Sequence, residues 1–195
     1  KEQSQYINMF KEAGIDAVIL PNPIDAPFMQ HVEQKNEGLK FLRIDADVNE
    51  TFKETEETDE AAKEQEKKDA ETLAEVFKKA IGNDKLNVKV EKLKNEGLAS
   101  MITVSEESRR MQDMMKQYGM AGMDPAMFGG QGETLVLNAN NALVKYIFEN
   151  KDSEHVPTFC QQLYDLAALA QRPLPAEEMT KFVARSNEIM MLLAK

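Results

Sequence analysis

Only a few side chains in this 195-residue chain could perform nucleophilic or acid–base chemistry. Cys160 is the single cysteine, and the nearest histidine in sequence, His155, precedes it by five residues and so falls on a different side of a helix. We therefore interpret Cys160 as a small buried apolar side chain. Asp45 and Asp47 are two residues apart at the end of a predicted strand and merely share one face. A small enzyme that uses Asp25, Asp45 or Cys160 is an alternative, but the sequence gives no convincing catalytic site.

Metal and nucleotide sites are equally poorly supported. One cysteine excludes an intramolecular disulfide and a cysteine-rich zinc site, and His31 and His155 are too few for a histidine-based metal centre. The glycine-rich residues 129–132 lack the Gly-Lys-Ser/Thr ending of a phosphate-binding loop and the spacing of a dinucleotide fingerprint. We expect no catalytic, cofactor or metal site in these residues and interpret 129–132 as a flexible joint.

The charge and hydropathy of the chain exclude two classes of partner. It has 34 acidic and 24 basic side chains, hence a net charge of −10, whereas nucleic acid and anionic membranes require clustered Lys and Arg. No apolar run approaches the roughly 18–20 residues of a membrane span, and no signal peptide follows Lys1. We expect a cytoplasmic protein with no nucleic-acid or membrane partner, cut from a longer chain.

Methionine is the informative residue type. Six of the twelve methionines lie between Met111 and Met127. The spacing i, i+3, i+4, i+7 places four residues on one face of a predicted helix: Met111, Met114, Met115 and Tyr118. Methionine is unbranched and polarisable, so it adapts to apolar surfaces of many shapes. Core packing and a partly exposed contact surface both stay open, because the glycine-rich segment that follows does not help to bury this face.

The elements that must position these residues divide into three segments. Residues 1–48 are predicted as helix, strand, helix and strand, with strands at 17–20 and 41–44, and two strands are too few for an independent sheet. We therefore expect the C-terminal end of a larger α/β domain there. Residues 49–71 contain ten acidic residues and four lysines, which indicates a solvated acidic connector leading into a helix.

Residues 72–195 are predicted as a complete domain, with the chain as a whole in the α+β class. A charged helix joins the partial α/β subdomain to a small C-terminal α/β domain with three strands and a terminal helix bundle. In this domain we expect a helix to about residue 81, paired strands at 86–93 and 99–104, a helix from Ser105, a third strand at 134–137, and helices near 142–149, 155–170 and 176–194.

The last two predicted helices carry apolar stripes that are broader than one small domain needs. Two antiparallel helices can bury one side against a sheet, and the same pair in a second copy would cover the excess as a four-helix interface about a two-fold axis. Alternatively, the excess faces the chain's own domain. The residues expected at a dimer interface are Phe159, Leu163, Leu166, Leu169, Phe182, Ile189, Met190 and Leu193.

Five stretches occur in the order found in one known family. They read YINMFKEAGIDAV at residues 6–18, NPID at 22–25, KFLRIDAD at 40–47, LVLNAN at 135–140 and QLYDLAAL at 162–169. Together they resemble heat-shock protein 90, and specifically its bacterial HtpG branch, over essentially the whole chain. The match is to the end of the middle domain and to the C-terminal dimerisation domain.

The resemblance implies a fragment of an ATP-dependent chaperone of the stress response. In the family, the terminal helices pair as a four-helix bundle, and an amphipathic helix between the second and third strands contacts client proteins. Met111, Met115 and Tyr118 match the exposed apolar face of that helix. The resemblance therefore implies a homodimer that binds unfolded or partly folded clients. The ATP and magnesium site of the full-length family member lies in regions absent here, so the resemblance implies that these residues do not hydrolyse ATP themselves. A structural homodimerisation module without a client role is the alternative.

Overall fold

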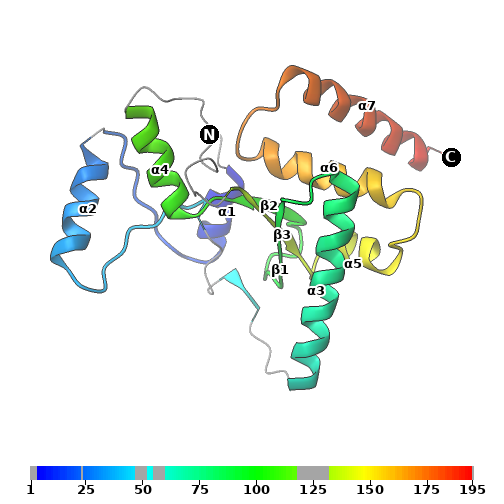
Figure 1. The fold of residues 1–195 in the computed structure, drawn as a ribbon, viewed down its shortest axis with the longest axis horizontal. Helices are drawn as coiled ribbons and strands as arrows, with labels where there is room; N and C mark the ends of the chain where they lie inside the picture. The colour runs from blue at the N-terminus through cyan, green and yellow to red at the C-terminus, as the bar shows by residue number, and fades with distance from the viewer. Residues whose placement is uncertain (1–3, 23, 47–51, 55–59, 118–131, 195) are drawn as a thin grey trace.

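The computed structural model describes residues 4–22, 24–46, 52–54, 60–117 and 132–194, which form an α+β fold, as the sequence predicts (Figure 1). In chain order the elements are α1 (Ser4–Glu12), α2 (Asp25–Lys35), α3 (Glu60–Ile81), β1 (Asn87–Glu91), β2 (Ser100–Thr103), α4 (Glu106–Gln117), β3 (Thr134–Asn138), α5 (Ala142–Glu149), α6 (Val156–Leu169) and α7 (Ala176–Leu193). The three strands and three terminal helices predicted for residues 72–195 are all present.

The three strands form one mixed sheet in the order β1-β3-β2. β3 is parallel to β1 and antiparallel to β2, and Leu135 lies opposite Val88 on one side and Ile102 on the other. The prediction that residues 99–104 pair directly with residues 86–93 is therefore wrong. Every residue of β3 is buried, whereas β1 alternates between exposed and partly buried positions along most of its length. A strand that is apolar on both faces suits the centre of a sheet, and a half-polar strand suits its edge.

Helices cover both faces of this sheet, and each face has its own core. α3, α5 and α6 pack on one face, and the buried residues of this first core are Leu73, Phe77, Leu86, Ile102, Leu135, Leu137, Val144, Ile147, Val156, Cys160, Leu163, Ala167, Ala168 and Leu174. α1 packs on the other face, where the buried residues are Tyr6, Met9, Phe52, Leu93, Met101 and Val136. Successive strand residues point to opposite faces, which is why β2 and β3 supply apolar side chains to both cores.

α1 is tied to the sheet although the sequence places it in a different segment. The Tyr6 hydroxyl donates a hydrogen bond to the backbone carbonyl of Ile102, and both groups are buried. The rings of Phe10 and Phe52 have centroids 5.0 Å apart. Burial raises the pKa of the Tyr6 hydroxyl, so this donor stays protonated at every physiological pH. The N-terminal helix is thus part of the packed body that contains β1–β3.

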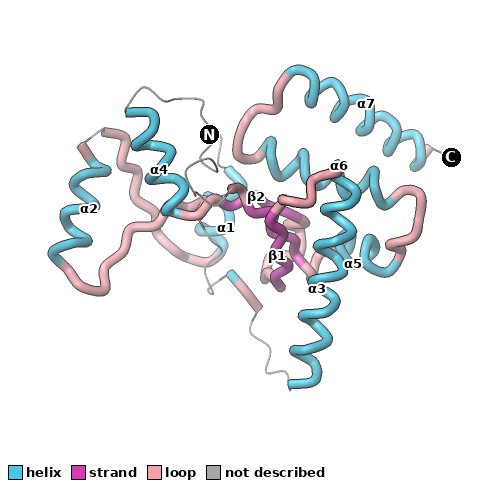
Figure 2. The backbone as a smooth tube through the Cα atoms, viewed as in Figure 1, coloured by secondary structure: helices cyan, strands magenta, loops and turns pink. Residues whose placement is uncertain are grey.

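The strands predicted at residues 17–20 and 41–44 are absent from the structure. Both segments are loops (Figure 2), and Ile19 is 88% exposed rather than covered on both faces. A strand needs a neighbour to satisfy its backbone N–H and C=O groups. Within the described residues, neither segment pairs with another strand, so the apolar run alone does not produce one.

The N-terminal half of α3 contains residues 60–71 of the predicted acidic connector. The buried residues of this helix, Leu73 and Phe77, come only in its second half, and the N-terminal end projects away from the sheet (Figure 1). The first half is therefore held by charge and helix propensity rather than by packing. Among the described residues, no helix combines the length and the apolar character that a membrane crossing would require.

Candidate functional site

α4 carries the methionines that the sequence singles out. The Ser105 hydroxyl accepts a hydrogen bond from the backbone N–H of Ser108 at 3.2 Å and so caps the start of the helix. Met114 is 50% exposed and Met115 is 5% exposed. Met111 is partly buried. The expectation that Met115 lies on the exposed side is therefore wrong, and the apolar surface presented by α4 centres on Met114. Tyr118 lies outside the described residues.

Two consecutive arginines hold α4 in place. Arg110 forms a bidentate pair with Glu33 of α2, with both N–O distances at 2.9 Å. These hydrogen bonds and that from the Phe41 backbone N–H lower the pKa of Glu33 to about 2. Arg109 pairs with the buried carboxylate of Asp45. The helix that presents Met114 is therefore docked by charge, which the sequence pattern of methionines does not reveal.

The apolar residues of α6 and α7 divide between the chain's own core and its surface. Leu163 is buried in the first core, and Phe159, Leu169 and Phe182 pack partly against it. Leu166 is 47% exposed. The exposed large apolar residues of α7 are Val183, Met190 and Met191, while Ile189 is partly buried. Of the predicted interface set, Leu166 and Met190 are thus the most accessible; the side chain of Leu193 is outside the described part of the chain.

A polar network fixes α7 against α6. Arg185 of α7 pairs with Asp165 of α6, and both side chains are largely buried. Arg185 Nε also donates to Gln162 Oε1 at 3.0 Å, and Gln162 Nε2 donates to the Ser186 hydroxyl at 2.9 Å. A buried ion pair requires such additional hydrogen bonds to offset the desolvation of its charges. Because these groups satisfy one another, the two helices keep a defined relative position while Leu166 and Met190 stay accessible.

Comparison with known proteins identifies the family. The model of the family described as Hsp90 protein matches residues 1–195. The chain belongs to the Hsp90 protein family. A relative named chaperone protein htpG from Bacteroides fragilis (strain 638R) is 33% identical over 190 residues, covering 92% of this chain and 25% of the relative.

Two further Hsp90-family relatives carry the name chaperone protein HtpG. The protein from Bacteroides thetaiotaomicron is 30% identical over 177 residues, covering 88% of this chain and 25% of the relative. The protein from Pseudoalteromonas translucida is 27% identical over 197 residues, covering 100% of this chain and 29% of the relative. The chain therefore spans only about a quarter of the length of these curated relatives.

The residues of the enzyme alternative are not assembled into one site in this Hsp90-family chain. Cys160 is fully buried in the first core, and this burial raises the pKa of its thiol to about 12, so it is a poor nucleophile. The Asp45 carboxylate forms an ion pair with Arg109. Asp25 accepts a hydrogen bond from the Asn22 backbone N–H at 2.7 Å, at the start of α2. The carboxylates of Asp45 and Asp25 therefore each make a structural contact, and the two contacts lie in different places.

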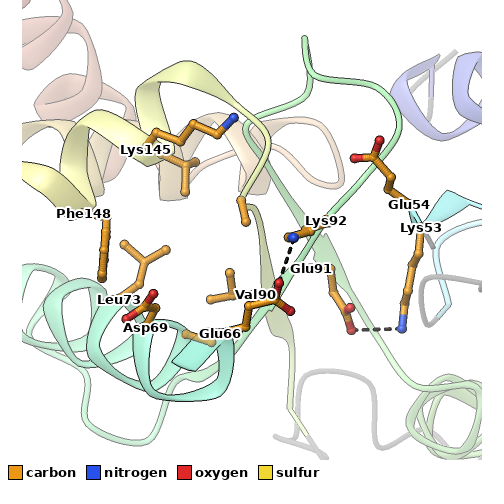
Figure 3. Close-up of a pocket in the computed structure, with 13 residues that line it drawn as sticks. Lys53, Glu54, Glu66, Asp69, Leu73, Val90, Glu91, Lys92, Lys145 and Phe148 are labelled. Atoms are coloured by element: carbon orange, nitrogen blue, oxygen red, sulfur yellow. Dashed lines mark hydrogen bonds and ion pairs between the residues drawn. The ribbon is translucent and has the colours of Figure 1, made fainter. Parts of the chain in front are cut away.

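A cavity of about 390 Å³ lies between α3, β1, α5 and residues 53–54. Figure 3 shows two ion pairs among its lining residues: Lys92 with Glu66 at 2.9 Å and Lys53 with Glu91 at 3.1 Å. The rest of the lining combines three more charged residues, Glu54, Asp69 and Lys145, with apolar side chains such as Phe148. None of the three residues of the enzyme alternative lines this cavity. Among the described residues, no cluster of three or more potential ligands could hold a metal ion.

Sequence reasoning missed the polar residues that fix the 93–98 loop and the position of α4. Asn138 is fully buried, and its side chain bonds the backbone of the 93–98 loop: Oδ1 accepts from Leu93 N–H at 2.9 Å, and Nδ2 donates to the carbonyls of Asn95 and Leu98. An asparagine at the end of an apolar strand was an available signal. A second signal was the pair Arg109 and Arg110 near a helix N-terminus, where cations oppose the helix dipole.

Proposed function

We propose that this chain is the C-terminal segment of an ATP-dependent molecular chaperone of the cytoplasm. In this proposal it homodimerises through α6 and α7 and contacts unfolded or partly folded clients through the Met114 surface of α4. The family match over residues 1–195 supports the chaperone assignment, and the relatives that carry the name chaperone support it independently. In this proposal, ATP is hydrolysed by other parts of the full-length protein, outside the segment to which this chain corresponds.

The half-exposed position of Met114 is the observation that carries the client proposal. Polar contacts of Arg109 and Arg110 hold α4 in place. The exposed side chain of Met114 is therefore not needed to attach the helix. A flexible thioether side chain at an exposed site adapts to many apolar partners, as a chaperone that binds diverse unfolded chains requires. The helix also presents Met111 one turn earlier, and this partly buried residue extends the surface.

The exposed apolar residues of α6 and α7 support the dimer proposal. Val183 and Met190 are seven residues apart and so lie on one face of α7. Leu166 is exposed on the neighbouring α6. Exposed apolar clusters on a helix pair favour a second copy as the covering partner, because a two-fold axis brings identical patches together. A dimer would keep two full-length chaperone arms at high effective concentration.

The client proposal is tested by binding a fluorescently labelled, permanently unfolded protein to the chain. Met114→Ser removes the exposed thioether, and Met191→Ser is the matched control because Met191 is also exposed but lies on α7. Burying half a methionine contributes about 1 kcal/mol, so we expect Met114→Ser to raise the Kd roughly fivefold. We expect Met191→Ser to leave client Kd unchanged. Equal client affinity for wild type and Met114→Ser would favour the alternative, a homodimerisation module without a client role.

A further inference from the structure

The first two turns of α4 contain two adjacent cations that reach in different directions. Positive charge near a helix N-terminus is unfavourable because it opposes the helix dipole, so Arg109 and Arg110 do not stabilise α4 as an isolated helix. Residues one position apart project about 100° apart around a helix. Each arginine can therefore contact a different part of the molecule, and each does.

Arg110 joins three segments at one point. Its two terminal nitrogens donate to the two carboxylate oxygens of Glu33 on α2, and its Nε donates to Glu106 Oε1 at 3.1 Å. The Glu33 carboxylate also accepts from the Phe41 backbone N–H at 2.8 Å. Glu106 Oε2 accepts from the Arg43 backbone N–H at 3.3 Å. α2 and α4 are neighbours in the ribbon view (Figure 1). One guanidinium and two carboxylates thus hold α2, residues 41–43 and α4 together.

Arg109 makes the deeper contact. Its partner, Asp45, is only 1% exposed, and Gln171, which follows α6, also donates to Asp45 Oδ2 at 3.1 Å. The Asp45 carbonyl accepts from the Val104 backbone N–H at 3.2 Å, at the end of β2. The start of α4 is therefore bound to the sheet and to the turn before α7.

We propose that Arg109 and Arg110 are positioning residues for α4, with Arg109 as the fixed anchor and the Arg110–Glu33 pair as the contact that sets the direction of the helix. The difference in burial decides these roles. Removing one partner of a buried pair leaves an uncompensated charge, so Arg109–Asp45 stays closed. The Arg110 side chain is 36% exposed, and a partly exposed pair has a smaller stabilising effect and opens more readily.

Hydrogen exchange of the backbone amides of α4 tests the role of the Arg110–Glu33 pair, because exchange reports how readily the helix opens. Glu33→Gln retains the size of the side chain but removes its charge. We expect exchange in residues 110–117 to accelerate roughly three- to tenfold, because a part-buried, charge-assisted pair is lost. Exchange in β3 should stay unchanged, which separates local release of α4 from global unfolding. Glu177→Gln is the matched control, because Glu177 also pairs with a cation, Lys181 at 2.7 Å, but on exposed α7.

A double-mutant cycle makes the test specific to the pair. Glu33→Gln and Arg110→Gln should each accelerate exchange, and the double variant should accelerate it by clearly less than the product of the two single effects. Multiplicative single effects, or unchanged α4 exchange in Glu33→Gln, would overturn the assignment.

The inference depends on the proposed function only where client binding is read out. If α4 is pre-organised for clients, Glu33→Gln should also weaken client binding, since a loosened helix must be ordered again on binding. Accelerated exchange with unchanged client Kd would support the positioning role and count against Met114 as the client contact, so the two proposals fail separately.

Discussion

Replacing Leu166 with glutamate perturbs the proposed dimer without entering the monomer's core. Leu166 is 47% exposed on α6, and it is not among the buried residues of the first core. Substitutions at such accessible positions usually change the free energy of unfolding by about 0.5 kcal/mol or less. The variant should therefore remain folded, and any change in its assembly reports on the interface.

The expected magnitude follows from the exposed half of the side chain. Complete burial of a leucine contributes about 1.5–3 kcal/mol, so covering the exposed half contributes about 1 kcal/mol per copy and about 2 kcal/mol for the two copies in a symmetric dimer. Leu166→Ala should raise the dimer Kd roughly 30-fold on this basis. Leu166→Glu also buries two carboxylates in an apolar contact, which costs several kcal/mol per ion, so its Kd should rise at least about a thousandfold.

Sedimentation velocity over a concentration series is the assay, with far-UV circular dichroism to verify folding. We expect wild type to sediment as a dimer at tens of micromolar and Leu166→Glu as a folded monomer. Leu42→Glu is the control, because Leu42 is an exposed leucine, 64% accessible, that lies outside α6 and α7. A Leu166→Glu variant that dimerises with the wild-type Kd would refute the placement of the interface on this face.

Two further predictions concern the polar contacts that shape the molecule. Asn138→Ala leaves the Leu93 N–H and two loop carbonyls without their buried partner; we expect a loss of about 2–4 kcal/mol in urea unfolding, and a change below about 0.5 kcal/mol would show that Asn138 is not a structural anchor. The pKa of Glu33 is lowered to about 2, so its contribution to stability is complete above its ordinary pKa of 4.5 and is lost as the pH falls toward 2. In an NMR titration of Arg110→Gln, this pKa should return toward 4.5, since the largest cause of its shift is removed; a pKa that stays near 2 would contradict the pairing.

The sequence predicts well those elements whose pattern reflects their own burial. β3 reads as a continuous apolar run and is buried along its whole length. α6 and α7 follow from apolar residues at helical spacing, and proline and glycine separate or end several of the elements. In these cases the local signal and the tertiary environment agree, which is the condition under which patterns are reliable.

The remaining features depend on partners that are distant in sequence. The apolar run at residues 17–20 is as strand-like as β3, yet it lacks a neighbouring strand in the described structure and is a loop. The strand order could not be read locally, because β1 and β2 are both compatible with direct pairing until β3 is placed between them.

The exposure and the docking of α4 could not be predicted from the local sequence either. Met114 and Met115 are adjacent and chemically identical, and only the packing around α4 makes one exposed and the other buried. The partners of Arg109 and Arg110, Asp45 and Glu33, precede them by more than sixty residues. Ionic contacts over such distances leave no periodic signal in a sequence, so the docking of α4 emerges only from the fold.

Site-specific photo-crosslinking tests most directly whether α4 contacts clients. A benzophenone amino acid is placed at position 114, at position 190 on α7 and, as an exposed control on α3, at position 75. After illumination with an unfolded client, position 114 should form client adducts, position 190 should link two copies of the chain, and position 75 should form neither in quantity. Client adducts that are no more abundant at position 114 than at position 75 would contradict the assignment of α4 as the client surface.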